Sequence, residues 1–307
     1  QTNNVIMRYV RTRNSTDGIN MIGVNAHDII LDHVTSTWTV DENMSTYTGS
    51  NDRVRNVSIQ WSILAEGLAP HSKGILLGYA TNISLHHNLF AHNQERNPRC
   101  QVGDIDVVNN VIYNYGASNG WCDTKHGPVK LNYIGNYTKK GLDSSDAPEM
   151  KGDAGVTIYA KGNVGPHRTT DTGDEWSVIG GSYTKSSIQF PYAKVTTTSA
   201  TQAYDQVLAQ AGASARLDAN GAFVSIRDSF DTRVVNDVKN GTGRIVSSPG
   251  TMPPLASGTP YPDIDQDGMS DTWETAKGLS VGTADHNGDK DGDSVTNLEE
   301  FLGGTTP

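Results

Sequence analysis

The sequence predicts an all-β fold: a right-handed parallel β-helix, built as a single-chain solenoid, with a small C-terminal calcium-loop tail. The first observation is a motif in which apolar residues alternate over three positions and which recurs roughly every 25 residues, within the range of solenoid repeats. Such a period is too short for a strand–helix–strand crossover and suits one turn of a parallel solenoid. The alternative, an antiparallel sandwich, would repeat its strands about every 8–12 residues. The repeats begin at Val5, Ile29, Val57, Ile83, Ile105, Val129 and Val156.

The second observation is that asparagine follows several of these repeats. Asparagine tolerates a left-handed backbone and can stack its amide on the turn above, which predicts a repeated corner of the solenoid. The two cysteines, Cys100 and Cys122, are separated by close to one period and are expected on neighbouring turns. Either a disulfide or two stacked free thiols fits that spacing. The corner asparagines are Asn88, Asn109, Asn110, Asn136 and Asn163.

The charge of the chain is concentrated near its C-terminus. The formal net charge is −10, and residues 260–307 contribute 11 acids and two lysines, a balance of −9. Residues 1–259 carry the remaining 23 acids and 22 bases, a balance of −1, so nucleic acid is not an expected partner. No apolar run reaches the length of about 18 residues that a membrane span needs. We expect a secreted protein that has lost a leader or begins inside a longer precursor.

The chain is expected to divide into three parts. Residues 1–246 form the β-helix with a C-terminal wrap, 247–262 form a linker with five of the 12 prolines, and 263–307 form the tail. The repeat fades after residue 163, and residues 164–200 are predicted to be an irregular loop. Two short helices are predicted after it, over 201–211 and over 229–239.

The tail contains two segments with the spacing of an EF-hand calcium loop. Short carboxylates at alternate positions can curl round one Ca²⁺ ion, and a terminal glutamate can close the shell. The second loop has Ser294 at position 6, where glycine is usual. A solvated acidic tail is the alternative interpretation. The predicted ligands are Asp263, Asp265, Asp267, Met269, Asp271 and Glu274 in the first loop, and Asp289, Asp291, Asp293, Val295, Asn297 and Glu300 in the second.

The main body carries a second set of charged residues on successive turns. Acids lie on the early turns, a lysine follows, and arginines lie on the next turn. In a solenoid these residues stack on one face, so they can share one groove that holds a metal ion beside fixed cations. Such a groove suits an acidic polymer that loses a proton next to a carboxylate. The residues are Asp17, Asp41, Glu42, Lys73, Arg96 and Arg99.

These segments resemble polysaccharide lyase family 1, the pectate lyases. The run DGINMIGVNAHDIILDHVT resembles the family's aspartate-containing turn and the strand after it. The run HSKGILLGYATNISLHHNLFAHNQERNPR resembles its lysine turn and its Arg-x-Pro segment. The resemblance covers residues 3–165, and RDSFDTRVVNDVKNGTG resembles the C-terminal wrap of bacterial members. Family members usually have a helix and further turns before the strand that begins here at Asn4, so we expect a preceding segment.

The resemblance implies calcium-dependent β-elimination of polygalacturonate, which yields 4,5-unsaturated oligogalacturonides. It implies that Arg96 is the catalytic base and that Lys73 and Arg99 bind substrate carboxylates. It also implies that Asp17 is a calcium ligand, with Asp41 and Glu42 as the further ligands. Two positions differ from the family pattern. The usual pair of acids four residues apart is replaced here by Thr37 or Ser45 beside Asp41, and Gln101 stands where the family has an arginine.

Two alternatives remain at this stage. A β-helix hydrolase of the polygalacturonase type needs two carboxylates that flank the scissile bond, and Asp41 with Glu42 do not make that case alone. A non-catalytic solenoid adhesin would carry the same charges as surface decoration. His86 and His87 have no third ligand at the spacing of a zinc site, so structural histidines are expected there. A tail of the predicted kind resembles those of secreted bacterial polysaccharide-degrading enzymes, where it serves as a spacer or docking module. The protein is expected to be a monomer.

Overall fold

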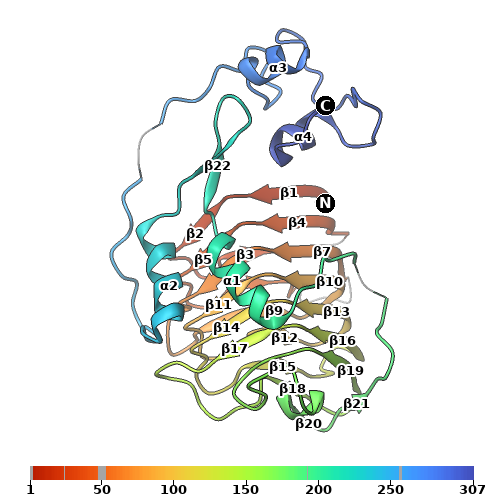
Figure 1. Cartoon of the computed structure of the whole chain (residues 1–307), viewed down its shortest axis with the longest axis vertical. Helices are drawn as coiled ribbons and strands as arrows, with labels where there is room; N and C mark the ends of the chain where they lie inside the picture. Colours follow the sequence, from red (N-terminus) through yellow and green to blue (C-terminus); the bar gives the residue numbers. More distant parts are fainter. Residues whose placement is uncertain (1–2, 24, 48–52, 192, 256–257) are drawn as a thin grey trace. The chain divides into compact units, whose positions relative to one another are not determined.

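A computed structural model describes residues 3–23, 25–47, 53–191, 193–255 and 258–307. The chain divides into two compact units, Gln1–Ser214 with Asp228–Met252, and Ala215–Arg227 with Pro253–Pro307. In the described part of the first unit, short strands stack into parallel sheets, one strand per sheet and turn (Figure 1). The predicted parallel β-helix is confirmed, because every strand pair in these sheets is parallel rather than antiparallel.

Three sheets make up the walls of this solenoid in the described residues. The first, in spatial order, contains β1 (Asn3–Arg8), β4 (His27–Asp32), β7 (Val54–Gln60), β10 (Ala80–His86), β13 (Gly103–Val108), β16 (Val129–Ile134), β19 (Val156–Lys161) and β21 (Thr184–Lys185). The second contains β17 (Tyr137–Lys139), β14 (Val111–Tyr113), β11 (Leu89–Ala91), β8 (Ile63–Ala65), β5 (Thr35–Thr37) and β2 (Arg11–Arg13). The third contains β20 (Ile179–Gly181), β18 (Met150–Gly152), β15 (Gly120–Cys122), β12 (Arg99–Cys100), β9 (Lys73–Leu77), β6 (Glu42–Ser45) and β3 (Ile19–Asn20).

The repeat read from the sequence corresponds to the first sheet. Val5, Ile29, Val57, Ile83 and Ile105 stack in one register column, and alternate residues on these strands are buried in one apolar core. The last two repeat positions are two residues out of register, because Ile105 pairs with Leu131 and Leu131 pairs with Ile158. A shift of two residues keeps the same face buried, which is why the alternation alone could not detect it.

The predicted asparagine corner is present as a buried ladder. The side-chain amide nitrogens of Asn88, Asn110 and Asn136 donate to the amide oxygen of the next ladder residue at 3.0, 3.1 and 3.0 Å, and Asn163 ends the series. Asn109 is not a ladder residue. It occupies the preceding left-handed position, with φ of 53°, and its amide donates to the carbonyls of Gly135 and Thr198. Side-chain amides therefore satisfy one another along the interior of the corner.

Several other sequence predictions can be compared with the structure. Cys100 and Cys122 are register partners on β12 and β15, and both are buried free thiols, so the stacked-thiol alternative holds. Residues 164–200 are not all irregular, because β20, β21 and the 3₁₀ helix η1 (Glu175–Val178) continue the solenoid there. These strands carry glycine and polar residues, which hid them from an apolar pattern.

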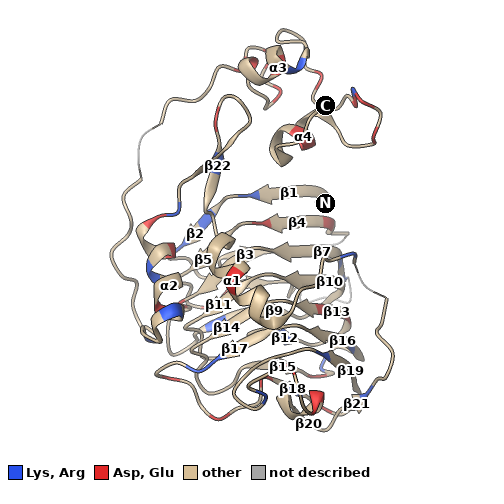
Figure 2. Ribbon diagram, viewed as in Figure 1, with Lys and Arg blue, Asp and Glu red and all other residues tan. Residues whose placement is uncertain are grey.

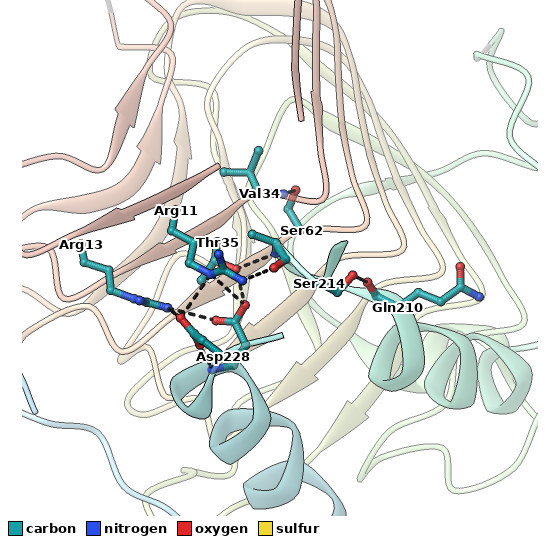
Figure 3. Close-up of polar contacts among 10 residues, drawn as sticks. Arg11, Arg13, Val34, Thr35, Ser62, Gln210, Ser214 and Asp228 are labelled. Atoms are coloured by element: carbon teal, nitrogen blue, oxygen red, sulfur yellow. Dashed lines mark hydrogen bonds and ion pairs between the residues drawn. The ribbon is translucent and has the colours of Figure 1, made fainter. Parts of the chain in front are cut away.

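The two predicted helices are confirmed as α1 (Ala200–Gln210) and α2 (Ser229–Asn240). Both pack on the second sheet through an apolar cluster that includes Ile63, Leu89 and Val234. The start of α2 is fixed by polar contacts with the first turns, shown in Figure 3. The Arg13 guanidinium donates to the Asp228 carboxylate at 2.7 Å, and the Thr35 hydroxyl donates to the buried carboxylate of Asp231 at 2.8 Å.

The second unit is larger than the predicted tail. It contains the hairpin of β22 (Ala215–Leu217) and β23 (Phe223–Ser225), which the sequence analysis assigned to the main body, together with α3 (Asp271–Lys277) and α4 (Asn297–Gly303). Met269, Trp273 and Phe301 form its buried core, and Leu217 of the hairpin packs against them. Residues 247–252, predicted to begin the linker, belong to the first unit.

One buried acid of the first sheet predicts a pH effect on stability. Burial raises the pKa of Asp106 from its ordinary 3.8 to about 6. A carboxyl group whose pKa is raised in the folded state stabilises the fold while it is protonated. This stabilisation is complete below pH 3.8 and is lost as the pH rises through 6. We therefore expect Asp106→Asn to increase the free energy of unfolding at pH 8 by about 1–2 kcal/mol. Denaturant unfolding of both proteins at pH 8 and at pH 3.5 measures this change in the free energy of unfolding. An equal change at both pH values would contradict the prediction.

Candidate active site

The predicted groove residues lie on the third sheet and the segments that enter it. Glu42 on β6 and Lys73 on β9 are register partners, and Lys73 also forms a parallel bridge with Glu95 on the next turn. Neighbouring strands are about 4.8 Å apart, so an acid, a lysine and a second acid stack along the groove. Glu95 was not among the predicted site residues, although it directly precedes Arg96 in the sequence.

Two ion pairs connect these turns. The Lys73 ammonium pairs with the Glu95 carboxylate, and the Arg96 guanidinium pairs with the Glu42 carboxylate. Lys73 and Glu42 are only 6% and 5% exposed, so both charges have left bulk water. Burial, with a smaller contribution from Arg99, lowers the pKa of Lys73. A buried cation of this kind is a strong partner for an incoming carboxylate, because the low local dielectric strengthens the attraction.

Arg96 is held by a closely packed backbone. It has φ of 62° in the segment between β11 and β12, and its carbonyl accepts a hydrogen bond from the Ile75 N–H at 2.8 Å. Gly74 makes this approach possible, since a Cβ there would lie 2.4 Å from the Arg96 carbonyl oxygen. A buried amide chain lies behind Arg96, from Asn43 to Asn93 at 3.1 Å and from Asn93 to Asn97 at 3.2 Å. The sequence analysis missed Asn43 and Asn93, which show no strand periodicity.

The surroundings of Arg96 shift its protonation equilibrium. Burial and then the positive charge of Arg99 lower the pKa of Arg96, while Asp41 and Asp123 oppose the shift. This shift is toward the neutral form of a group that ordinarily stays charged. Arg99 is fixed separately, because its Nε donates to the Asp123 carboxylate at 2.9 Å. The buried Gln101 side chain also reaches Asp123, so it supports Arg99 from behind.

A group of possible metal ligands lies at the same end of the groove. Asp41, Glu42 and His71 each offer one ligand atom, and these atoms lie within 4.8 Å of one another. Carboxylate oxygens are the ligands that calcium prefers, so Asp41 and Glu42 fit it, whereas the imidazole nitrogen of His71 does not. The His71 Nε2 lies 2.9 Å from an Asp41 oxygen. His71 was not predicted, and its place two residues before Lys73 is the signal that could have found it.

Asp17 lies on the turn next to this group. Among the residues that the structure describes, it is not a member of the group. The Gly18 N–H donates to the Glu42 carbonyl at 3.1 Å, which places the neighbouring turns together. The Asp17 carboxylate itself accepts a hydrogen bond from the Asn20 amide at 2.8 Å. Thus the structure brings Asp41 and Glu42 together and leaves Asp17 as a neighbour on the preceding turn.

A row of outward-facing residues extends from the groove along the third sheet. Arg99, Trp121 and Lys151 are register partners on β12, β15 and β18. The Arg99 guanidinium carbon lies 4.1 Å and the Lys151 ammonium 4.9 Å from the centre of the Trp121 ring, so a tryptophan face lies between two cations. The sequence analysis missed Trp121 and Lys151. The turns that separate the three residues differ in length, so their alignment cannot be predicted from the sequence unless the register of the strands is known.

The acids of the two tail loops converge as their spacing predicts. Figure 2 shows acidic positions recurring around α3 and α4. Ligand atoms of Asp263, Asp265 and Asp267 lie within 4.8 Å of one another, and those of Asp289, Asp291 and Asp293 do the same. Burial, and then the charges of Asp265 and Asp267, raise the pKa of Glu274 to about 7. Negative charge gathered in this way favours a cation.

Some predicted tail ligands have other partners. The Asp271 carboxylate accepts from the Ile264 N–H at 2.8 Å, and the Asn297 amide donates to the Asp285 carbonyl at 2.9 Å. Met269 and Val295 were predicted as ligands from their loop positions, and Met269 packs its side chain in the core of the unit. Glu300 is 2% exposed, and its Oε2 has no hydrogen-bond partner in the described ranges.

Glu42, Lys73, Arg96 and Arg99 lie together on or beside the third sheet of a parallel β-helix, an arrangement that suits the class of solenoid enzymes acting on acidic polysaccharides. No family model matches the chain. Probable pectate lyase C of Aspergillus oryzae is 32% identical over 318 residues, which cover 98% of this chain and 72% of that protein. Probable pectate lyase C of Neosartorya fischeri is 33% identical over 297 residues, covering 91% and 67%.

The chain therefore belongs to the pectate lyase family, and the predicted enzyme class, a polysaccharide lyase, is confirmed. Among solved structures, a pectate lyase from Bacillus sp. N165 in complex with trigalacturonate has a TM-score of 0.39 and 17% identity, over 64% of this chain and 71% of that one. That likeness is too low to support an argument about the groove. Within the described residues, no helix is long and apolar enough to cross a membrane.

Proposed function

We propose that the groove cleaves polygalacturonate by calcium-dependent β-elimination and releases 4,5-unsaturated oligogalacturonides. The observation that carries the proposal is the ion pair between Arg96 and Glu42, because Glu42 also belongs to the group of possible metal ligands Asp41, Glu42 and His71. It places a candidate base next to a candidate cation site, with Lys73 one turn away. A hydrolase would need two carboxylates with separate roles on either side of the scissile bond. Asp41 and Glu42 instead lie next to each other in one cluster, which does not suit that mechanism.

Calcium held by Asp41 and Glu42, with Asp17 nearby, would neutralise the charge that develops on the sugar carboxylate. Arg96 removes the C5 proton, a double bond forms between C4 and C5, and the C4–O bond breaks with its electrons going to oxygen. That oxygen then takes a proton. The ion pair with Glu42 stabilises charged Arg96, so Arg96 acts as a base only when the pair is broken.

Substrate binding is proposed to run along the third sheet. Lys73 and Arg99 each bind a carboxylate of the polymer, and Trp121 offers a ring face between Arg99 and Lys151. Cations on several turns of one sheet suit a linear polyanion better than a small neutral sugar. A groove on one face of one chain needs no second subunit, so the active species is proposed to be a monomer. Secretion follows from this substrate, because such a polymer is met outside the cell.

Each tail loop is proposed to hold one calcium ion apart from the groove. The ligands are those predicted from the sequence: Asp263, Asp265, Asp267, Met269, Asp271 and Glu274 for the first ion, and Asp289, Asp291, Asp293, Val295, Asn297 and Glu300 for the second. The convergence of these acids supports the proposal. The tail then acts as a spacer or docking module, not in catalysis.

The groove assignment is tested by two matched variants. Glu42→Gln should raise the calcium concentration for half-maximal activity about tenfold, because it removes one charged ligand. Glu95→Gln removes the same charge from the same groove but breaks only the pair with Lys73. Because Glu95 competes with a substrate carboxylate for Lys73, its loss should lower KM for polygalacturonate and leave the calcium requirement unchanged. Initial rates of near-ultraviolet absorbance over a calcium series measure both. Equal calcium requirements for the two variants would contradict the assignment.

A further inference from the structure

The first calcium loop of the tail belongs to an acidic cluster that extends beyond the loop. Ligand atoms of Asp267, Glu274 and Asp285 lie within 4.8 Å of one another. Asp285 follows Glu274, the last position of the first loop, and precedes Asp289, the first position of the second, so it is outside both loops. No EF-hand position accounts for an acid at this point of the chain.

Several buried carboxylate oxygens in and beside this cluster have no hydrogen-bond partner in the described residues. Glu274 is 0% exposed, and both its carboxylate oxygens lack a hydrogen-bond partner in the part of the chain that the structure describes. The same is true of both oxygens of Asp265 and of the Oδ1 of Asp285. Buried charge without a partner is strongly unfavourable, so converging carboxylates with free buried oxygens favour the binding of a cation.

We propose that Asp285 is a ligand of the first-loop calcium ion, which is thereby held by the loop and by the segment between the loops. Calcium takes six to eight oxygen ligands with flexible geometry, and five carboxylates can supply most of them. Those carboxylates belong to Asp263, Asp265, Asp267, Glu274 and Asp285.

The other contacts of Asp285 fix it for this role. Its Oδ2 accepts a hydrogen bond from the Ser280 N–H at 3.1 Å, which leaves Oδ1 for a metal ion. Its own N–H donates to the Asp267 carboxylate at 3.2 Å, so the backbone of this segment is tied to the loop. Its carbonyl accepts from the Asn297 amide at 2.9 Å, at the start of α4. Asp285 therefore connects the first ion to the helix that carries Glu300 of the second loop.

The experiment is a calorimetric titration of calcium chloride into the full chain without substrate. Asp285→Asn keeps an oxygen that can accept from Ser280 but removes the charge, and it should weaken the first-loop calcium site at least about tenfold. Asp265→Asn, at position 3 of the loop, should weaken the same site. Asp205→Asn removes the same charge from an exposed position of α1 and should titrate as the wild type does.

A second measurement separates a ligand from a merely structural residue. Calcium should raise the thermal midpoint of the tail, followed by the fluorescence of the buried Trp273, and Asp285→Asn should need about tenfold more calcium for the same midpoint. An Asp285→Asn protein with unchanged calcium affinity would overturn the proposal. An Asp285→Asn protein whose tail stays unfolded at saturating calcium would also overturn it. So would an Asp265→Asn protein that binds calcium as tightly as the wild type does.

Discussion

Arg96→Ala is expected to lower kcat on polygalacturonate by about 10³-fold, because it removes the group proposed to take the C5 proton. KM should change little, since Lys73 and Arg99 remain to bind carboxylates. Arg96→Lys should also lose most activity. A lysine ammonium is a single point charge and cannot reproduce the planar, multidentate shape of a guanidinium.

The control for this variant is Arg216→Ala, which removes an exposed arginine of the second unit. It should leave kcat and KM unchanged. Circular dichroism and the unfolding midpoint must show that Arg96→Ala keeps its fold. A folded Arg96→Ala protein that turns over polygalacturonate near the wild-type rate would remove Arg96 from the mechanism.

Removal of calcium is expected to lower kcat/KM by at least about 100-fold, because several kcal/mol of charge stabilisation at the sugar carboxylate would be lost. Added calcium should restore the rate. The tail ions should not contribute, so Asp265→Asn combined with Asp291→Asn should keep wild-type activity at saturating calcium. Rates before and after chelation, for both proteins, are the measurement.

Point substitutions test this separation better than truncation does. Leu217 of the hairpin packs against the core formed by Met269, Trp273 and Phe301, so deletion of residues 260–307 would expose apolar surface. If the doubly substituted, folded protein lost all activity at saturating calcium, the tail would be part of catalysis. If chelation left the wild-type rate unchanged, the groove would work without calcium.

The sequence predicted the solenoid because its signal is local. Alternation at Ile29, Val57 and Ile83 marks one buried face in each turn, and asparagines such as Asn110 mark the corner that follows. Register was less certain, since a slip of two residues at Leu131 leaves the pattern intact. The last turn was missed because β20 and β21 are short and polar or glycine-rich.

The candidate site was predicted in part for a related reason. Glu42, Lys73 and Arg96 stand in recognisable motifs, and the structure brings them together through two ion pairs and one register column. Trp121 has no such local mark. It lies beside Arg99 only because turns of unequal length stack in a fixed register, which single-sequence spacing does not determine.

The most direct test of the central claim is a single time course on polygalacturonate in which near-ultraviolet absorbance and new reducing ends are measured together. Elimination gives one conjugated 4,5-unsaturated sugar for each new reducing end, so the two signals should rise in equal molar amounts from the start of the reaction. Reducing ends without absorbance would identify a hydrolase, and neither signal at saturating calcium would identify a binding solenoid. Either result would contradict the account of Arg96 as the base of a calcium-dependent lyase.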